Sequence, residues 1–199
     1  YDIKTKDYLP GYTDRAIRLI HTATQPFGYF DTTATHTFNT NPELTTVTYH
    51  ISLGQPILIN QLNITLDGPG KNEPRFTHLL SNSPLQIGEI LNTDEYNILK
   101  RNLSNTAASL GYFNSEIETS QILINREAHT ADITIKMNTH TRAKFGTTTF
   151  SKNSLDPTFI KKFLAYREGE NYDAKKIQKT QRDLINSGYF QRVLVTPQT

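Results

Sequence analysis

Leu110-Gly111-Tyr112-Phe113 ends a helical pattern and begins a strand pattern, and its Gly-Tyr-Phe tripeptide occurs twice more in the chain. The other copies are Gly28-Tyr29-Phe30 and Gly188-Tyr189-Phe190, so neighbouring copies lie about 80 residues apart. Self-similarity at a regular spacing indicates one small structural unit used in series. The sequence therefore predicts a tandem array, and the question of function becomes what a row of such units binds.

The residues before the central copy begin with a predicted strand and a short helix. Residues 57–66 are rich in branched apolar side chains, with a break in their alternation near Gln61, and they predict a strand. The segment 67–70, Asp-Gly-Pro-Gly, ends this strand with turn-forming residues. Residues 75–80 then predict a short helix.

A longer helix and two strands complete the central pattern. Thr93 is the candidate N-cap of the helix, and Gly111 is placed to end it in the left-handed conformation that glycine adopts easily. Strands are predicted at 113–124 and 131–137, which gives the order β-α-α-β-β. The apolar face of the helix follows steps of three and four: Tyr96, Leu99, Leu103, Ala107 and Leu110.

The last part of the chain repeats this order and stops before the final strand. Residues 144–150 predict its first strand, and Asp156 followed by Pro157 predicts a helix with an acidic N-cap and proline at the first helical position. Asp173 begins a longer helix, which Gly188 caps. Residues 190–195 predict the next strand.

The first part of the chain shows only the later elements of the pattern. Residues 14–27 predict a helix whose last turn Pro26 distorts. Strands at 32–38 and 44–53 form a predicted hairpin around the turn residues 39–42. We expect an α+β fold of tandem β-α-α-β-β repeats, each a small three-stranded mixed sheet packed on two helices. The expected repeats are 1–53 (incomplete at its start), 54–141, and 142–199 (without its final strand).

Composition excludes several classes of protein. A net charge of +2 is too small to imply nucleic-acid binding, and the absence of cysteine excludes disulfides and thiolate chemistry. No run of about 20 apolar residues could span a membrane, and no signal peptide is visible. Because Tyr1 is not an initiator methionine, we expect a mature or cut fragment of a longer array.

No motif for catalysis or cofactor binding is present. The six histidines show no zinc-binding spacing, and the chain has no phosphate-binding glycine loop and no nucleophile elbow. We therefore expect no enzyme activity, no metal and no cofactor. The recurrent Gly-Tyr-Phe is interpreted as architectural: glycine turns the chain and the two rings take opposite sides of a strand. An aromatic ligand site repeated three times is the alternative.

The β-α-α-β-β unit that ends its second helix in Gly-Tyr-Phe resembles the POTRA domain, a periplasmic repeat that precedes the β-barrel of outer-membrane assembly proteins. Within that family the arrangement is most similar to TamA-type proteins. The opening strand of the last repeat departs slightly, because Lys152-Asn153 stands where Gly-Asn is usual. The segments that carry the resemblance are 91–96, 110–113, 142–150, 168–172 and 195–197.

The resemblance implies a periplasmic scaffold attached to an outer-membrane barrel. Its implied partners are a TamB-like protein anchored in the inner membrane and unfolded outer-membrane protein clients, including autotransporters. Phospholipid traffic is implied as well, and the basic segment Lys152–Arg182 could face anionic lipid headgroups; a solvated pair of helix faces is the alternative. The near rivals are BamA-like proteins and two-partner secretion transporters, and the distant rival is a small hydrolase or ligand-binding protein.

Strand addition is the binding mode that we expect. In POTRA folds the strand after Gly-Tyr-Phe lies at a sheet edge, where an extended partner can complete its main-chain hydrogen bonds. The candidate edge strands are 32–38, 114–124 and 191–195, and we favour 114–124. The alternative is an edge that is merely solvated or covered by a loop. The residues predicted to face outward for a partner are Asn114, Glu116, Glu118, Ser120 and Ile122.

Overall fold

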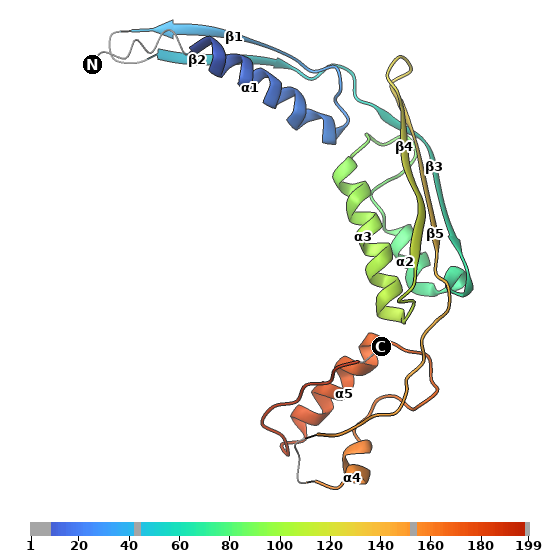
Figure 1. Ribbon diagram of the computed structural model, residues 1–199. Coiled ribbons are helices and arrows are strands. Elements are labelled where there is room, and N and C mark those ends of the chain that lie inside the picture. The colour runs from blue at the N-terminus through green and yellow to red at the C-terminus, as the bar shows by residue number, and fades with distance from the viewer. Residues whose placement is uncertain (1–8, 42–44, 152–154, 198–199) are drawn as a thin grey trace. The chain divides into compact units, whose positions relative to one another are not determined.

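The computed structural model describes residues 9–41, 45–151 and 155–197. Helix α1 (Leu9–Thr24) continues into a 3₁₀ turn, η2 (Gln25–Phe27), that contains Pro26. The predicted helix is thus confirmed, with an earlier start, and its last turn is tightened where proline removes a backbone donor. Strands β1 (Thr33–Thr40) and β2 (Thr45–Ser52) form the predicted antiparallel hairpin beside α1 (Figure 1).

A three-stranded sheet follows, with strand order β3-β5-β4. Strands β4 and β5 are an antiparallel hairpin. Strand β3 runs parallel to β5, because hydrogen bonds join its start to His129 and its end to Thr139. The predicted mixed sheet is confirmed, and the last strand of the hairpin is the central one. The bounds of the strands are Leu58–Asp67 for β3, Glu116–Asn125 for β4 and Thr130–Asn138 for β5.

The central strand supplies much of the core. Its alternate side chains, from Ala131 through Ile133 and Ile135 to Met137, are at most 1% exposed. Strand β3 alternates less regularly, because Asn60 and Gln61 are both exposed, which confirms the predicted break near Gln61. The helices on this part of the chain are η3 (Pro69–Asn72), α2 (Pro74–Ser81) and α3 (Thr93–Leu110), and α3 buries Leu99, Leu103, Ala107 and Leu110.

One predicted helix cap is wrong by one residue. The side chain of Asn92 accepts hydrogen bonds from the backbone N–H groups of Asp94 and Glu95, at 3.0 and 3.2 Å. Asn92 is therefore the N-cap of α3, and Thr93 is its first helical residue.

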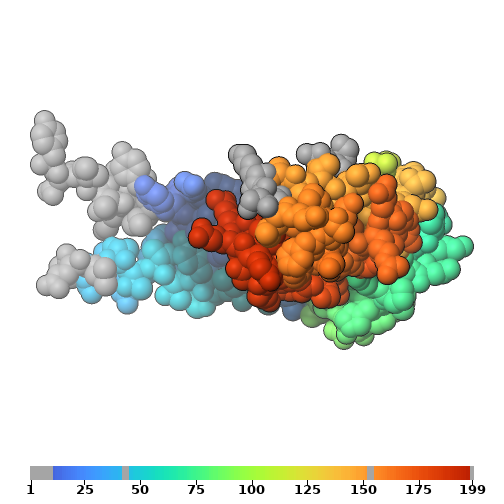
Figure 2. All heavy atoms as spheres, turned by 90° about the horizontal axis from the view of Figure 1, so that it is seen from below, coloured from blue at the N-terminus to red at the C-terminus, as the bar shows by residue number. Residues whose placement is uncertain are grey.

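The C-terminal segment, residues 142–197, contains helices α4 (Pro157–Lys161) and α5 (Ala174–Asn186). This segment is coloured orange to red in Figure 2. The predicted caps are confirmed, since the carboxylates of Asp156 and Asp173 accept hydrogen bonds from Thr158 and Lys175. The hydrogen bonds from Thr158 hold the pKa of the Asp156 carboxyl below its usual value.

The two strands predicted in the C-terminal segment are wrong. Residues 145–150 and 191–197 have no strand assignment, and Lys144 forms only an isolated bridge with Asn171. The physical reason is that strands exist by pairing, and no described strand of this segment lies between these two stretches.

Contacts within the chain group it into two compact units. Of the described residues, unit 1 contains 9–41, 45–64, 83–100 and 120–135, and unit 2 contains 65–82, 101–119, 136–151 and 155–197. The division crosses β3, α3, β4 and β5. It differs from the three-repeat division, whose boundaries stay a prediction. The residues that pack around Gly28 belong to unit 1, and those around Gly111 belong to unit 2.

In unit 2, Gly111 ends α3, and its carbonyl forms a hydrogen bond with the start of the C-terminal segment. Its φ is +90°, and the N–H groups of Gly111 and Tyr112 bond to the carbonyls of Ala108 and Ala107, at 3.1 and 2.9 Å. These two bonds define a Schellman cap. The carbonyl of Gly111 then accepts the N–H of Ala143 at 2.8 Å. A methyl group on Gly111 would lie 2.8 Å from Cβ of Tyr172.

The same arrangement occurs around Gly28 in unit 1. Its φ is +84°, and Gly28 and Tyr29 form the same pair of capping bonds, with Gln25 and Thr24. The carbonyl of Gly28 accepts the N–H of Ile57 at 2.8 Å, and a methyl group there would lie 2.7 Å from the carbonyl of Leu91. The repeated glycine therefore has two structural roles. Its positive φ turns the chain at the end of the helix, and its lack of a side chain lets the backbone of the next segment pack closely against it.

We predict that Gly111→Ala destabilises unit 2 more than Gly188→Ala does. Gly188 also has a positive φ, +75°, but nothing lies within 4 Å of an added methyl group. The left-handed conformation alone should cost about 1–2 kcal/mol, and the clash with Tyr172 should add about 1–3 kcal/mol. Urea unfolding of both variants measures the difference, and equal losses would show that the close approach to Tyr172 is not a constraint.

Candidate binding surfaces

Strand β4 lies at an edge of the three-stranded sheet, bonded to β5 on one side only. Within the described residues, no main-chain hydrogen bond from another segment reaches its outer side. The opposite edge differs, because Ile59 of β3 exchanges two main-chain bonds with the segment 88–89, at 2.9 and 2.7 Å. The free edge that the sequence favoured is therefore present at β4, and its role in binding stays a prediction.

The five residues predicted to face outward differ in their position relative to β4 and in their exposure. Asn114 precedes β4, whereas Glu116, Glu118 and Ser120 are exposed strand residues. Ser120 and Gln121 are both exposed, so the alternation shifts by one residue there. Ile122 consequently falls on the half-buried side, and its prediction as an outward residue is wrong; Leu123 is 58% exposed instead.

The exposed face beside this edge carries a charge cluster. Lys136 of β5 lies 3.0 Å from the Glu118 carboxylate and 3.5 Å from that of Asp67, and Asn138 also donates to Glu118. The bonds from Lys136 and Asn138 lower the pKa of Glu118, and the bond to Glu118 raises the pKa of Lys136. These charges keep the face hydrated but leave the backbone groups of the edge open.

The other two candidate edges are weaker. Strand β1 pairs only with β2 in a two-stranded sheet, which is marginal without further packing. Its first predicted residue, Thr32, is buried and bonds to Thr24 and Leu53 rather than to solvent. Residues 191–195 are not a strand at all.

Arg142 fastens the start of the C-terminal segment within unit 2. Its guanidinium donates to the Leu110 carbonyl at 2.7 Å, to the Glu73 carboxylate at 2.5 Å and to the Tyr172 carbonyl at 3.2 Å. It also lies 5.5 Å from the centre of the Tyr112 ring. Burial, with the Glu73 carboxylate next in importance, raises the pKa of Tyr112. One side chain thus ties together the end of α3, the start of α2 and the loop before α5.

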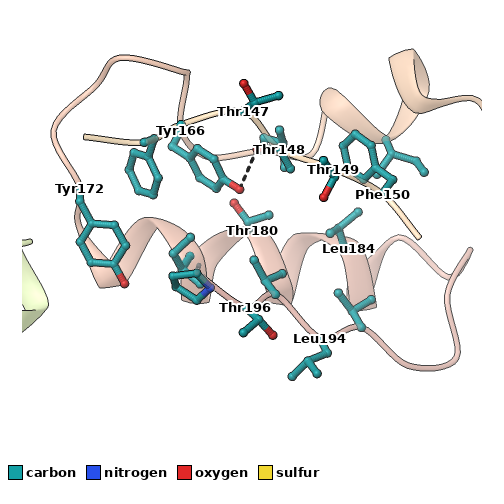
Figure 3. A pocket seen from close by; sticks show the side chains of 18 of the residues that line it. Thr147, Thr148, Thr149, Phe150, Tyr166, Tyr172, Thr180, Leu184, Leu194 and Thr196 are labelled. Carbon is teal, nitrogen blue, oxygen red and sulfur yellow. Dashed lines mark hydrogen bonds between the residues drawn. The ribbon is translucent and has the colours of Figure 1, made fainter. Parts of the chain in front are cut away.

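A cavity of about 660 Å³ opens in the C-terminal segment (Figure 3). Its floor is α5, from which Thr180 and Leu184 face the opening. Its rims are the stretches 143–151 and 192–197, and Phe113 and the predicted site residue Asn114 also line it. The stacked rings of Phe145 and Tyr166 both line the cavity. The hydroxyl of Tyr166 lies 3.2 Å from that of Thr148, which is another lining residue.

Two kinds of feature are absent from the described part of the chain. No group of three or more histidine, cysteine, aspartate and glutamate side chains could hold a metal ion there. No described helix is both long and apolar enough to cross a membrane.

The Nδ1 atom of His129 is buried and has no hydrogen-bond partner among the described residues.

Comparison with known proteins finds a family match in the central segment. Residues 63–139 match the family model described as "POTRA: Surface antigen variable number repeat". The match covers η3, α2, α3, β4 and β5, and thus includes the free edge.

The chain is also similar to solved POTRA arrays. It shares 16% identity with the crystal structure of Haemophilus influenzae BamA POTRA3-5, over 90% of this chain and 70% of that one, with a TM-score of 0.49. It shares 15% with the N-terminal domain of Omp85 from Thermosynechococcus elongatus, over 90% and 74%, with a TM-score of 0.36. For Haemophilus ducreyi BamA lacking POTRA domains 1-3 the identity is 17%, the coverage 64% and 23%, and the TM-score 0.35. The family match concerns residues 63–139 alone.

Sequence reasoning missed Arg142 and the cavity. Arg142 stands at the start of the segment 142–150 that resembles a POTRA strand, but a single arginine beside a predicted strand gives no sign of its partners. Its closest bonds reach Glu73, far away in sequence.

We predict that Arg142→Lys destabilises unit 2 by about 1–2 kcal/mol, because an ammonium cannot reproduce the forked bonds and Glu73 is left half-buried with a weaker partner. Lys136→Ala is the matched control, since it removes an exposed ion pair that should contribute little. Urea unfolding measures both. An Arg142→Lys variant as stable as the wild type would mean that charge alone matters at this position.

Proposed function

We propose that the chain is the periplasmic POTRA region of an outer-membrane assembly protein, and that it acts as a scaffold that binds extended partners by strand addition. The observation that carries this proposal is the unpaired outer side of β4 in the central POTRA repeat. An edge strand offers a row of N–H and C=O groups that an extended segment can complete. No catalytic role is proposed.

Main-chain pairing suits a scaffold that meets different clients. The hydrogen bonds of a strand ladder do not depend on side-chain identity, so β-rich segments of many sequences can add to the same edge. Glu116, Glu118 and Ser120 are exposed on β4 and set only modest preferences. Exposed Leu123 offers one apolar contact toward the hairpin end of the strand.

The finer assignment that we favour is a TamA-like protein. It rests on the resemblance of residues 91–96 and 110–113, and it implies a TamB-like partner and outer-membrane protein clients such as autotransporters. A BamA-like protein is the alternative and fits the POTRA match equally well. The number of POTRA repeats before the barrel discriminates them: three favour TamA, five BamA, and two a two-partner secretion transporter.

Lipid headgroups are a weaker candidate partner. The basic segment contains cations that already have partners, because Lys176 lies 2.6 Å from Glu170 and Lys179 lies 2.7 Å from Asp183. Paired lysines attract an anionic surface less than free ones do.

We predict that a proline in β4 weakens binding to the C-terminal periplasmic region of a TamB-like partner. Adjacent residues of a strand direct their N–H groups to opposite sides, so only one of Glu118→Pro and Thr119→Pro leaves the β4–β5 ladder intact. Circular dichroism identifies the variant that keeps its fold. Loss of one hydrogen bond and the clash of the ring should weaken that variant by about tenfold, measured by calorimetry.

Glu118→Gln is the matched control, since it changes the side chain and keeps the backbone donor. Its affinity should stay close to that of the wild type. Equal affinity of the folded proline variant would place the contact away from β4, and a loss with Glu118→Gln alone would mean that charge, rather than main-chain pairing, determines binding.

A further inference from the structure

Lys100 of α3 lies beside β4, the strand with the free edge (Figure 1). Its ammonium donates a hydrogen bond to the hydroxyl of Ser120 at 3.0 Å and lies 5.0 Å from the centre of the Tyr96 ring. Tyr96 is buried, so the half-buried lysine covers a ring of the core while its charge stays at the surface. These two contacts hold Lys100 in one place on the sheet.

That place is the free side of β4. Helix α3 packs on the face of the sheet that buries Ile133, whereas Ser120 belongs to the exposed face. Strand β5 occupies one side of β4, so a lysine of α3 meets Ser120 around the other side. The ammonium of Lys100 therefore lies where a partner strand would add.

Lys100 has no carboxylate within ion-pair distance among the described residues. Other cations of the central segment differ, because Lys136 and Arg142 each lie beside a glutamate. The two groups that contact the Lys100 ammonium, a hydroxyl and an aromatic ring, are both neutral. Because hydrogen bonds between charged groups are about twice as strong as those between neutral ones, a carboxylate is the better partner for this ammonium.

The open main-chain groups beside Lys100 can be assigned to residues. The carbonyl of His129 accepts from Leu58 of β3, so the odd-numbered residues of β5, which are the buried ones, bond to β3. The even-numbered residues then bond to β4. Directly opposite residues of antiparallel strands share a face, so the exposed residues of β4 are those that bond to β5. Half-buried Ile122 consequently directs its N–H and C=O to the free edge.

We propose that Lys100 gives the β4 edge a preference for strands that carry an acidic side chain at one position. The inference rests on the proposed function, because it requires a strand at this edge. A strand residue beside Ile122 places its side chain on the helix side of the sheet, since neighbouring residues of paired strands share a face. An aspartate or glutamate there replaces Ser120 as the partner of Lys100. Side-chain identity stays free at the other positions.

The same position disfavours a basic side chain. A lysine or arginine beside Ile122 would place a second positive charge near the Lys100 ammonium, and like charges side by side on a sheet are destabilising. An uncharged side chain gains and loses little. The expected order of affinity is therefore acidic, then neutral, then basic. Main-chain pairing alone gives no such order, so the order distinguishes a role of Lys100 from strand addition in general.

The test uses the whole chain and labelled peptides with the sequence Thr-Ile-Thr-Xaa-Thr-Ile-Thr-Val-Thr, in which Xaa is Asp, Asn or Lys. Both peptide ends are blocked, so Xaa carries the only charge. Fluorescence anisotropy should show saturable binding, with the Asp peptide about fivefold tighter than the Asn peptide and the Lys peptide weakest. High salt should reduce these differences. Equal affinities of the three peptides would refute the role of Lys100.

Variants of α3 assign the preference to Lys100. Lys100→Met keeps an unbranched chain over Tyr96 and removes the charge, so the Asp and Asn peptides should bind it equally. Lys100→Glu should reverse the order and bind the Lys peptide best. Arg101→Glu is the matched control, since Arg101 is exposed and turned about 100° around the helix from Lys100. It makes the same change of charge and should keep the order of the wild type.

Circular dichroism checks the fold of each variant. A folded Lys100→Met variant that still prefers the Asp peptide contradicts the proposal. So does one that binds all three peptides more tightly by the same factor, because Lys100 would then only shield the edge. A reversed order in Arg101→Glu as well would mean that the overall charge of α3, and not Lys100, sets the preference.

The folded proline variant of β4 separates this inference from the proposed function. Peptides that bind it as well as they bind the wild type would lie away from β4, which overturns the role of Lys100. Equal affinities of the three peptides for the wild type, lost in the proline variant, would leave strand addition standing and exclude only the preference. If no peptide binds the wild type saturably, the edge does not accept strands, and the proposed function fails together with this inference.

Discussion

The bond between a helix-capping glycine and the next segment is the constraint on which this structure depends. Gly28 and Gly111 each take a positive φ, and each carbonyl accepts an amide hydrogen at 2.8 Å from a residue about 30 positions further along the chain. A side chain at either position would meet the residue that packs there, Leu91 or Tyr172. The helix end and the beginning of the next segment are therefore fixed by the same residue. This explains why glycine, and not asparagine, stands at each of the two positions: asparagine tolerates the φ value but not the close approach.

Local signals in the sequence were enough to predict most elements of the fold. Asp156 and Asp173 precede helices because their carboxylates accept hydrogen bonds from first-turn amides, and the 3₁₀ turn at Pro26 follows from its missing donor. The break near Gln61 was visible because alternation is itself the signal. The N-cap of α3 was misplaced by one residue, since Asn92 and Thr93 are both good caps and the choice between them depends on three-dimensional geometry.

Features that depend on distant partners could not be predicted. Residues 144–150 and 190–195 have the alternation of strands, but a strand also needs a neighbour, and local pattern carries no information about whether one is present. The same limit applies to Arg142, because its hydrogen-bond partners are the Glu73 carboxylate and two carbonyls distant in sequence. It applies to Ile122 as well, because a shift of one residue at Ser120–Gln121 moves its side chain to the other face of the sheet. These predictions failed because tertiary pairing, rather than propensity, decides the outcome at these residues.

An edge strand such as β4 and a central strand such as β5 differ in what they accept beside them. An edge bonds to its partner on one side, and the partner's side chains stay largely at the surface, so affinity comes from the backbone and discrimination is low. A central position bonds on both sides and buries every second side chain, as the full burial of Ile133 and Ile135 shows for β5. Discrimination there comes from the cost of burying a polar group without a partner. Side-chain identity therefore matters little for a segment that adds to the β4 edge and much at a central position such as that of β5.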